Sequence, residues 1–368
     1  MRMRNKKVFK ITGLLLAGLL LTGCGDSTPK EEDTMNETVA MQDTEEAIAE
    51  AIRQETAQVD DTPAPAPTQS PEAEKTEGTE TADDREPTAD IDDKIPVKYI
   101  SYQLKEAGTI EQITYTSKDY FGDGSDVEKA ANVYLPYGYD ESKQYNVLYL
   151  MHGIGGDENE WGMTGYDSRV KLIMDNLIYN GDIEPFIVVT PNGRSSANHA
   201  ANGSDFNSFY CFGQELRNDL IPYMESHYST YAQYDENGYD LSATRQHRAM
   251  AGLSMGGMQT INIGIGECVD LFSYFGAFSA APTSNAASVT AKKLADNTLP
   301  IDYFYNICGT NDNIAYASAS AAAKTLPTLS DQFTDGENFM WKELPGGHDF
   351  NIWYLGFYHF AQLAFSKN

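Results

Sequence analysis

The segment Gly252-Leu-Ser254-Met-Gly256 carries the clearest chemical signal in the sequence. It lies between a short apolar run, residues 248–252, and a stretch of helically spaced apolar residues, 255–265. A serine flanked by glycines at a strand-to-helix turn is typical of a nucleophile elbow, because the tight turn strains the backbone of the serine and leaves room only for small neighbours. The pattern therefore predicts that Ser254 is a nucleophile raised above the edge of a sheet.

A serine hydroxyl needs a general base, and after an elbow of this kind an acid and then a histidine follow in the chain. Only His348 and His359 come after Ser254. His348 lies in a glycine-bounded loop directly after the last predicted strand, whereas His359 lies inside a predicted closing helix. We therefore predict that His348 is the base and that His359 has a packing or surface role.

The acid of such a triad has to come from a segment between the serine and the histidine. Asp312 directly follows a predicted strand, whereas Asp302 begins that strand at its opposite end and Glu343 lies within the last strand. The carboxyl ends of parallel strands meet at one edge of a sheet, which is where such sites form. Asp312 is therefore the predicted acid, with the role of fixing the tautomer of His348 and stabilising its protonated form.

Ester cleavage also needs two backbone N–H groups that bind the developing oxyanion. One is normally on the residue after the nucleophile, which here is Met255. The glycine-rich loop 152–156 follows an early predicted strand, and its Ile154 N–H is the predicted second donor. His152 begins this loop but precedes Ser254, so a structural role in bonding the loop is favoured over a role as the base.

The spacing of apolar residues predicts alternating strands and helices between these segments. The predicted strands cover 131–136, 146–151, 185–190, 248–252, 274–278, 303–308 and 338–344. The predicted helices cover 170–179, 213–227, 255–265, 314–326 and 350–365. This alternation indicates an α/β protein in which a mostly parallel central sheet has helices on both faces. Together with the elbow at Ser254, it predicts the α/β-hydrolase fold.

Seven segments together resemble carbohydrate esterase family 1, the esterase D-like α/β hydrolases, and in particular the feruloyl esterase domains attached to bacterial xylanases. They are residues 133–139, 147–156, 219–225, 247–257, 278–282, 308–312 and 346–351, and the likeness spans about 105–366. The resemblance implies the same triad of Ser254, Asp312 and His348. It also implies the same oxyanion donors, Ile154 and Met255, with no cofactor and no metal. The implied reaction is removal of ferulate or acetate from plant hemicellulose, chiefly arabinoxylan.

Several features bear on the substrate pocket and leave alternatives open. Trp161 follows the oxyanion loop and could stack on a sugar or an aromatic acid, or pack in the core. The long loop 192–210 lies on the predicted active-site side and leaves the acyl specificity open. Residues 234–243 look like an insertion, for which a surface hairpin is the favoured interpretation. No cysteine lies in a CxxC or Cys/His pattern, so a zinc site is not indicated.

The first 95 residues differ in composition from the rest. Residues 1–23 have five basic residues and a 14-residue apolar run, too short to span a bilayer, and are predicted to be a lipoprotein signal peptide. They end before Cys24, in a sequence that resembles the bacterial lipoprotein processing box, so Cys24 is the predicted lipidation site. Residues 24–95 read as a disordered acidic, Pro/Thr-rich tether, whereas the esterase domain 96–368 holds 41 of the 42 aromatic residues.

The net charge of the predicted folded region limits the kinds of molecule that it can bind. The segment 96–368 carries a net charge of −16, which disfavours nucleic acid. The expected partners are a feruloylated or acetylated plant polysaccharide or oligosaccharide, and a membrane through the N-terminal lipid. The expected location is extracytoplasmic, anchored to the cell membrane of a Gram-positive surface. Three alternatives remain at this stage: an acetyl xylan esterase, an acyl transferase to a sugar acceptor, and a catalytically dead glycan-binding lipoprotein.

Overall fold

In the computed structural model of the chain, the described residues are 92–102, 105–201, 206–232, 234 and 239–366. The predictions for the signal peptide 1–23, for Cys24 and for all but the last residues of the tether fall on residues 1–91. They therefore lie outside the described residues.

Eight strands form one sheet in the order β1-β2-β4-β3-β5-β6-β7-β8. The strands are β1 (Thr109–Lys118), β2 (Asp126–Leu135), β3 (Val147–Met151), β4 (Ile187–Pro191), β5 (Arg248–Leu253), β6 (Tyr274–Phe278), β7 (Tyr303–Gly309) and β8 (Phe339–Leu344). β2 pairs antiparallel with both β1 and β4, and all other neighbours are parallel. The α/β-hydrolase fold with a mostly parallel sheet is thus confirmed.

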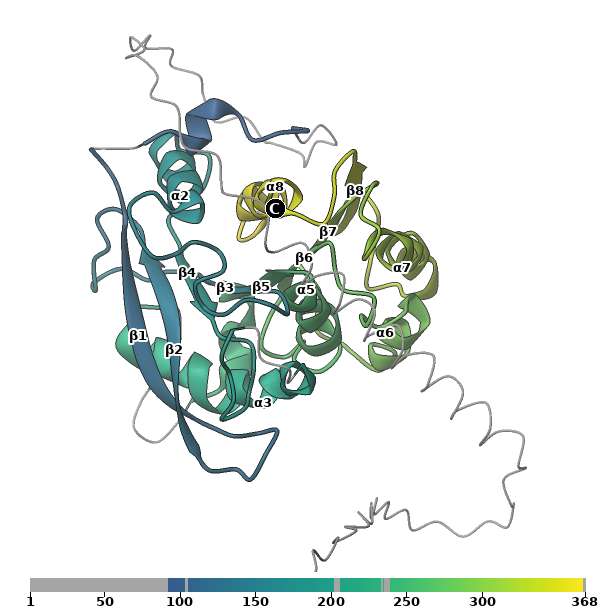
Figure 1. Ribbon diagram of the computed structural model, residues 1–368, viewed down its shortest axis with the longest axis horizontal. Helices are drawn as coiled ribbons and strands as arrows, with labels where there is room; N and C mark the ends of the chain where they lie inside the picture. The colour runs from purple at the N-terminus through teal and green to yellow at the C-terminus, as the bar shows by residue number, and fades with distance from the viewer. Residues whose placement is uncertain (1–91, 103–104, 202–205, 233, 235–238, 367–368) are drawn as a thin grey trace, which may run out of the picture. The chain divides into compact units, whose positions relative to one another are not determined.

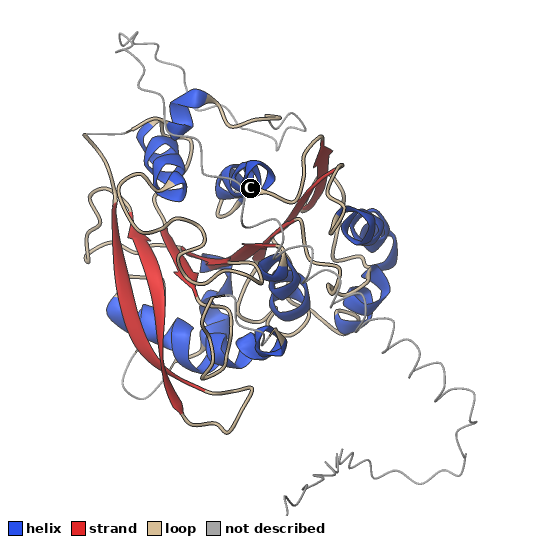
Figure 2. Cartoon of the chain, in the orientation of Figure 1, coloured by secondary structure: helices blue, strands red, loops and turns tan. Residues whose placement is uncertain are grey.

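Helices cover both faces of this sheet (Figures 1 and 2). The α-helices are α2 (Arg169–Tyr179), α3 (Phe212–Glu215), α4 (Ile221–His227), α5 (Met255–Gln259), α6 (Ala287–Lys293), α7 (Tyr316–Leu329) and α8 (Phe350–Leu363). Two further segments, Leu216–Leu220 and Thr260–Ile265, are π-helical, and they continue α3 and α5. One apolar cluster joins α2 and α8 to one face of the sheet, and a second joins α3, α4 and the π-helical segments to the other.

Strand register brings the candidate site together. Met151 pairs with Gly252, Leu253 with Phe278, and Phe278 with Ile307. The carboxyl ends of β3, β5, β6 and β7 therefore lie along one edge of the sheet. The loops that carry Ile154, Ser254 and Asp312 all start from this edge.

Among the described residues, one strand and one α-helix were not predicted, and one prediction was wrong. β1 and α6 lie outside all the segments that apolar spacing indicated. A surface hairpin was expected over 234–243, but the described residues there contain no strand. Instead, the Asp240 carboxylate accepts from the Ser242 N–H and begins a 3₁₀ helix, Leu241–His247. A local side-chain bond to the backbone thus favours a helical turn over strand pairing.

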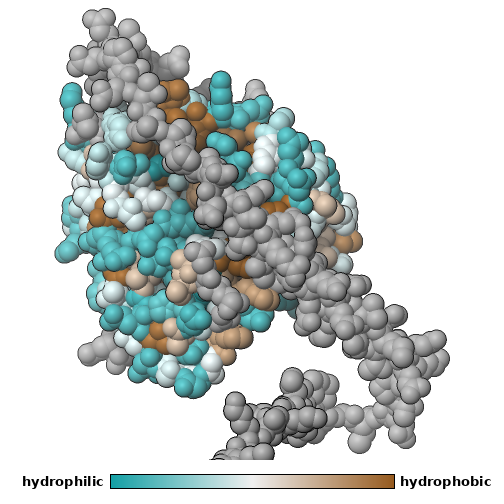
Figure 3. Space-filling model, viewed as in Figure 1, coloured by the Kyte–Doolittle hydropathy of each residue, from teal (hydrophilic) through white to brown (hydrophobic). Residues whose placement is uncertain are grey.

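The exposed apolar surface is dispersed. Hydrophobic patches are small and interspersed with hydrophilic residues on the face shown in Figure 3. Large exposed apolar side chains come from separate elements, as with Tyr137, Tyr166 and Leu329. Within the described residues, no helix combines the length and apolar character needed to cross a bilayer.

Candidate active site

The turn at Ser254 has the geometry of a strained elbow. Ser254 follows β5 directly and has φ +47°, in the left-handed region that costs non-glycine residues free energy. Its N–H donates to the Phe278 carbonyl at 2.9 Å, which anchors the turn to β6. A Cβ on Gly252 would lie 2.6 Å from the Gly256 carbonyl carbon, and a Cβ on Gly256 would lie 2.6 Å from the Met151 oxygen. The two glycines are therefore required by close backbone contacts.

The three residues of the predicted triad form one hydrogen-bonded line. His348 Nε2 lies 3.0 Å from Ser254 Oγ, and His348 Nδ1 lies 2.7 Å from Asp312 Oδ2. All three residues are buried, since Ser254 is 0% exposed, Asp312 3% and His348 7%. This arrangement can pass a proton from the serine hydroxyl to the imidazole while the carboxylate holds the ring.

Asp312 is kept ionised by donors that converge on it. Its Oδ1 accepts from the N–H groups of Ile314 and Ala315, at 2.9 and 2.8 Å, leaving Oδ2 for His348. Burial by itself raises the pKa of Asp312. The hydrogen bond and charge of His348, with the Ala315 N–H, outweigh burial and leave this pKa below its usual value. An ionised Asp312 can stabilise the protonated form of His348.

The two predicted oxyanion donors lie beside the elbow. Met255 is the first residue of α5, where a helical N–H has no partner within its own helix. Ile154 follows β3 and belongs to the same apolar cluster as Met255. Among the described residues, neither the Ile154 N–H nor the Met255 N–H donates a hydrogen bond. Both groups are therefore available to an oxygen atom that carries negative charge.

His152 has the structural role that the sequence favoured. Its Nε2 accepts from the Gly193 N–H at 2.9 Å, so Nδ1 carries the proton and donates to the Gly153 oxygen at 2.6 Å. Burial lowers the pKa of His152 to about 3, helped by the positive charge of Arg194. The ring is thus neutral near pH 7, and both of its nitrogens are bonded to backbone.

Trp161 lies in the core, so the stacking role left open by the sequence does not fit its position. Its side chain is 0% exposed, and its indole N–H donates to the Met151 oxygen at 3.0 Å. Rings of β6 and α8 enclose it, with centroids between 5.8 and 6.2 Å away: Phe278, Phe350, Tyr354 and Phe357. Trp161 therefore joins the start of the oxyanion loop to the closing helix.

Aromatic side chains beside the elbow were not identified individually from the sequence. Ile154 and Met255 pack in one cluster with Phe209, and the partly buried Phe206 and Tyr210 lie against it. All three rings belong to the loop predicted to shape the pocket, residues 192–210, or to the 3₁₀ helix Asn207–Cys211 that ends it. The sequence shows several aromatic residues in this loop, but nothing in their spacing indicates which rings pack beside Ile154 and Met255.

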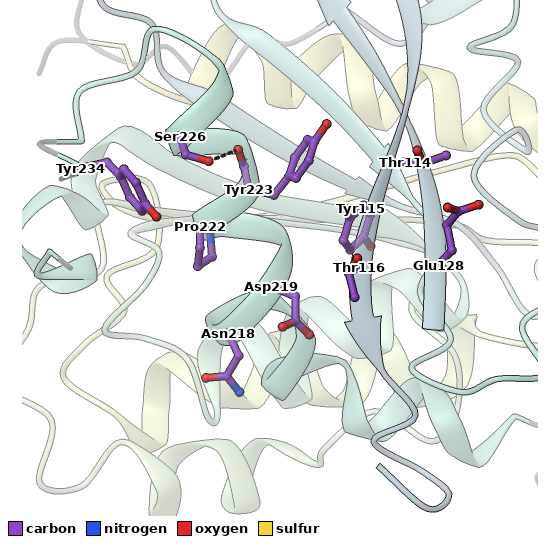
Figure 4. A pocket seen from close by; sticks show the side chains of 10 residues that line it. All are labelled: Thr114, Tyr115, Thr116, Glu128, Asn218, Asp219, Pro222, Tyr223, Ser226 and Tyr234. Carbon is purple, nitrogen blue, oxygen red and sulfur yellow. Dashed lines mark hydrogen bonds between the residues drawn. The ribbon is translucent and has the colours of Figure 1, made fainter. Parts of the chain in front are cut away.

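A cavity lies away from the triad, between β1 and the segment 218–226 (Figure 4). It encloses about 490 Å³ and is lined mostly by hydroxyl, amide and carboxylate side chains, among them Thr114, Asn218 and Asp219. None of the triad residues lines it. In the described part of the chain, no group of three or more His, Cys, Asp or Glu side chains is placed to hold a metal ion.

Two curated relatives are similar to this chain. Endo-1,4-beta-xylanase Y from Acetivibrio thermocellus is 36% identical over 252 residues, which cover 66% of this chain and 21% of the relative. An endo-1,4-beta-xylanase/feruloyl esterase from Xylanibacter ruminicola is 37% identical over 182 residues, which cover 47% of this chain and 22% of the relative. The chain thus spans about a fifth of the length of these two relatives.

Solved structures and a family profile agree with these similarities. A mutant feruloyl esterase module from Clostridium thermocellum, complexed with sinapinate, has 32% identity and a TM-score of 0.62, covering 75% of this chain and 94% of that one. A CE1 ferulic acid esterase from Anaeromyces mucronatus in complex with ferulic acid has 30% identity and a TM-score of 0.61, covering 76% and 98%. The profile of a family described as putative esterase matches residues 126–355. The chain therefore belongs to the putative esterase family, and it has the α/β-hydrolase fold of the carbohydrate esterase family 1 feruloyl esterases.

Proposed function

We propose that the protein is a serine carboxylic-ester hydrolase that removes feruloyl groups from plant hemicellulose such as arabinoxylan. The observation that carries this proposal is the buried, hydrogen-bonded line from Ser254 through His348 to Asp312. The feruloyl specificity is supported by the similarity to feruloyl esterases and by the aromatic side chains beside the elbow.

The geometry supports a two-step acyl transfer. Ser254 Oγ attacks the ester carbonyl carbon while His348 Nε2 takes the hydroxyl proton. The N–H groups of Ile154 and Met255 donate to the oxyanion of the tetrahedral intermediate. His348 then gives its proton to the sugar oxygen that leaves. In the second step His348 deprotonates a water, which attacks the acyl-enzyme and releases the acid, and the proton returns to Ser254.

The apolar cluster at the elbow suits a planar aromatic acyl group. Phe206 and Tyr210 are only partly buried, so part of each side chain remains exposed beside this cluster. An aromatic acid gains free energy by covering such side chains, whereas an acetyl group has much less apolar surface to bury. The polar sugar would remain outside this cluster.

The membrane anchor is also a proposal, supported by the sequence alone. Signal peptide cleavage before Cys24 and lipidation of its thiol would place the esterase outside the cytoplasm. The acidic, Pro-rich tether would hold the esterase away from the membrane surface, within reach of a bulky polysaccharide.

Methyl ferulate hydrolysis by the purified protein tests the activity, with Ser254→Ala as the matched variant. We expect ferulate release by the wild type and none by the folded variant. Cleavage of p-nitrophenyl acetate without ferulate release would indicate an acetyl esterase. Acyl transfer to a sugar acceptor without hydrolysis would indicate a transferase. A wild type with none of these reactions would contradict the proposal and favour a glycan-binding protein.

A further inference from the structure

The oxyanion loop has one internal backbone hydrogen bond, from the Gly156 N–H to the Gly153 oxygen at 3.4 Å. Three of its five residues, 152–156, are glycines, whose backbones have unusual conformational freedom. A donor in an oxyanion site is effective only if it already points to where charge will develop. One long backbone hydrogen bond does not fix three glycines, so the direction of the Ile154 N–H also depends on side-chain contacts. One of these is the Glu160 carboxylate, which accepts from the Gly153 N–H at 2.6 Å.

His152 and Arg194 supply such contacts at three carbonyls of the loop. His152 Nδ1 donates to the Gly153 oxygen at 2.6 Å. Arg194 Nη1 donates to the Gly156 oxygen at 2.6 Å, and Arg194 Nη2 donates to the Ile154 oxygen. Arg194 is 0% exposed, and its guanidinium carbon lies 4.8 Å from the centroid of the Phe209 ring. A planar guanidinium can donate to two carbonyls at once, whereas an ammonium has no such fixed fork.

These contacts determine the direction of the Ile154 N–H. The peptide group that joins Gly153 to Ile154 is planar and trans, so its carbonyl and its N–H point in opposite directions. Holding the Gly153 oxygen with His152 therefore aims the Ile154 N–H. Arg194 donates to the next carbonyl, that of Ile154. The peptide groups on both sides of the Ile154 Cα are thus held, which restricts rotation of the Ile154 backbone.

The same segment also contacts the helix that carries the second donor. The Gly193 N–H donates to His152 Nε2, and the Gly193 oxygen accepts from Gln259 Nε2 at 2.9 Å. Gln259 is the last residue of α5, and Met255 is the first. A Cβ on Gly193 would lie 2.8 Å from the Gln259 side-chain oxygen, so a larger residue there would displace the Gln259 amide. One short segment thus links the supports of both N–H groups.

We propose that Arg194, together with His152, is a positioning residue for the oxyanion site, which holds the loop carbonyls and thereby fixes the Ile154 N–H. This inference rests on the proposed function, because it requires Ile154 to bind an oxyanion during ester cleavage. Removing the guanidinium should lower the rate of the chemical step and leave ground-state binding of the acyl group nearly unchanged.

The test compares Arg194→Met with Arg245→Met. Arg245 is also a buried arginine that donates to three backbone carbonyls, but these belong to loops at the opposite edge of the sheet: Val269, Phe272 and Pro300. Both variants should lose stability. Only Arg194→Met should lower kcat for p-nitrophenyl acetate, by roughly 10- to 100-fold with KM changed less than about threefold, since losing an oxyanion donor outright costs about 100- to 1000-fold.

A second measurement distinguishes a loss of oxyanion positioning from a general loss of order in the active site. A trifluoromethyl ketone forms a tetrahedral adduct with a serine nucleophile, so its affinity depends on the oxyanion donors, whereas that of the product acid depends much less on them. In Arg194→Met the ketone should bind more weakly by about the factor lost in kcat, and ferulate binding should be retained. Arg194→Lys should fall between wild type and Arg194→Met, and it serves if the methionine variant does not fold.

Three results would overturn the inference. They are a kcat of Arg194→Met and Arg194→Lys within threefold of wild type, an unchanged ketone affinity, and an equal loss of kcat in Arg245→Met. A wild type that hydrolyses no ester would instead contradict the proposed function. In that case the rate at which a fluorophosphonate labels Ser254, compared between wild type and the variants, decides the inference by itself.

Discussion

Asp312 and Glu343 are two carboxylates near the same edge of the sheet with different surroundings. Asp312 is buried and accepts a hydrogen bond from His348, whereas Glu343 is exposed, accepts from Trp341 and pairs with Lys324. The pKa of Glu343 is lowered, chiefly by the hydrogen bond from Lys324. Both acids are therefore stabilised in the charged form, but only Asp312 is coupled to the imidazole that faces Ser254.

Asp312→Asn should keep the fold and remove most of the activity. The asparagine oxygen can still accept from Ile314 and Ala315, but the amide no longer stabilises a protonated His348. We expect kcat to fall by about 10⁴, the size of the effect known for the equivalent change in a serine protease. Glu343→Gln, measured by the same ester assay, should keep kcat within about twofold. Equal losses in the two variants would contradict the assignment of the acid.

Individual site residues differed in how well the sequence could predict them. Ser254, Asp312 and His348 lie in short motifs directly after strands, so their meeting place followed from the order of the strands. The burial of Trp161 depends on Phe350 and Phe357, about 190 residues later in the chain. The residues next to Trp161 in the sequence give no indication of that contact. Arg194 was missed for a similar reason, since its partners belong to another loop.

Strands that are buried on both faces of the sheet could be predicted from the sequence. β3 and β4 are buried along their whole length and read as continuous apolar runs. β1 alternates buried and exposed residues because one face of this edge strand is open to solvent. Ile113, Tyr115 and Ser117 point inward, and this period-two pattern is a weaker signal of a strand than a continuous apolar run. α6 is two turns long and ends in two lysines, so it offers little apolar periodicity.

A buried ion pair holds residues 192–195 and the helical layer to β2. Lys129 Nζ lies 3.1 Å from Glu215 Oε2, and the side chains are 1% and 0% exposed. Lys129 also donates to the Asn192 and Arg194 oxygens, and Glu215 accepts from Ser195 Oγ at 2.7 Å. The pair thus sits beneath the segment that we propose to support the oxyanion loop.

Breaking this pair from one side should be costly. Lys129→Met leaves a buried carboxylate without its cation, so we expect the free energy of unfolding to fall by about 3–5 kcal/mol. Adding Glu215→Gln removes the carboxylate left without a cation. The free energy of unfolding of the double variant should therefore fall by less than the sum of the decreases in the two single variants. Urea denaturation measures both effects. Arg217→Met breaks the half-exposed pair with Asp270 and should cost under about 1 kcal/mol. Additive losses at Lys129 and Glu215 would contradict this account.

On the scale of the whole molecule, two buried histidines make stability depend on pH. His359 is 1% exposed, accepts from the Tyr305 hydroxyl at Nδ1 and donates from Nε2 to the Asp92 oxygen. Burial is the largest cause that lowers the pKa of His359 to about 3, as it does for His152. Between pH 3 and about 6.5 the unfolded chain therefore binds protons that the folded chain does not, and the free energy of unfolding falls as the pH falls.

His359→Gln isolates one of these contributions. The variant should be less stable than wild type at pH 7, because the amide replaces the two ring hydrogen bonds imperfectly. The difference in unfolding free energy should then shrink by about 2 kcal/mol between pH 7 and pH 5, since only the wild type loses the stability linked to this imidazole. Urea denaturation at several pH values measures the difference. His227 is exposed, so His227→Gln should keep the wild-type slope. A wild type and a His359→Gln variant with parallel pH dependence would show that His359 already takes up its proton in the folded protein.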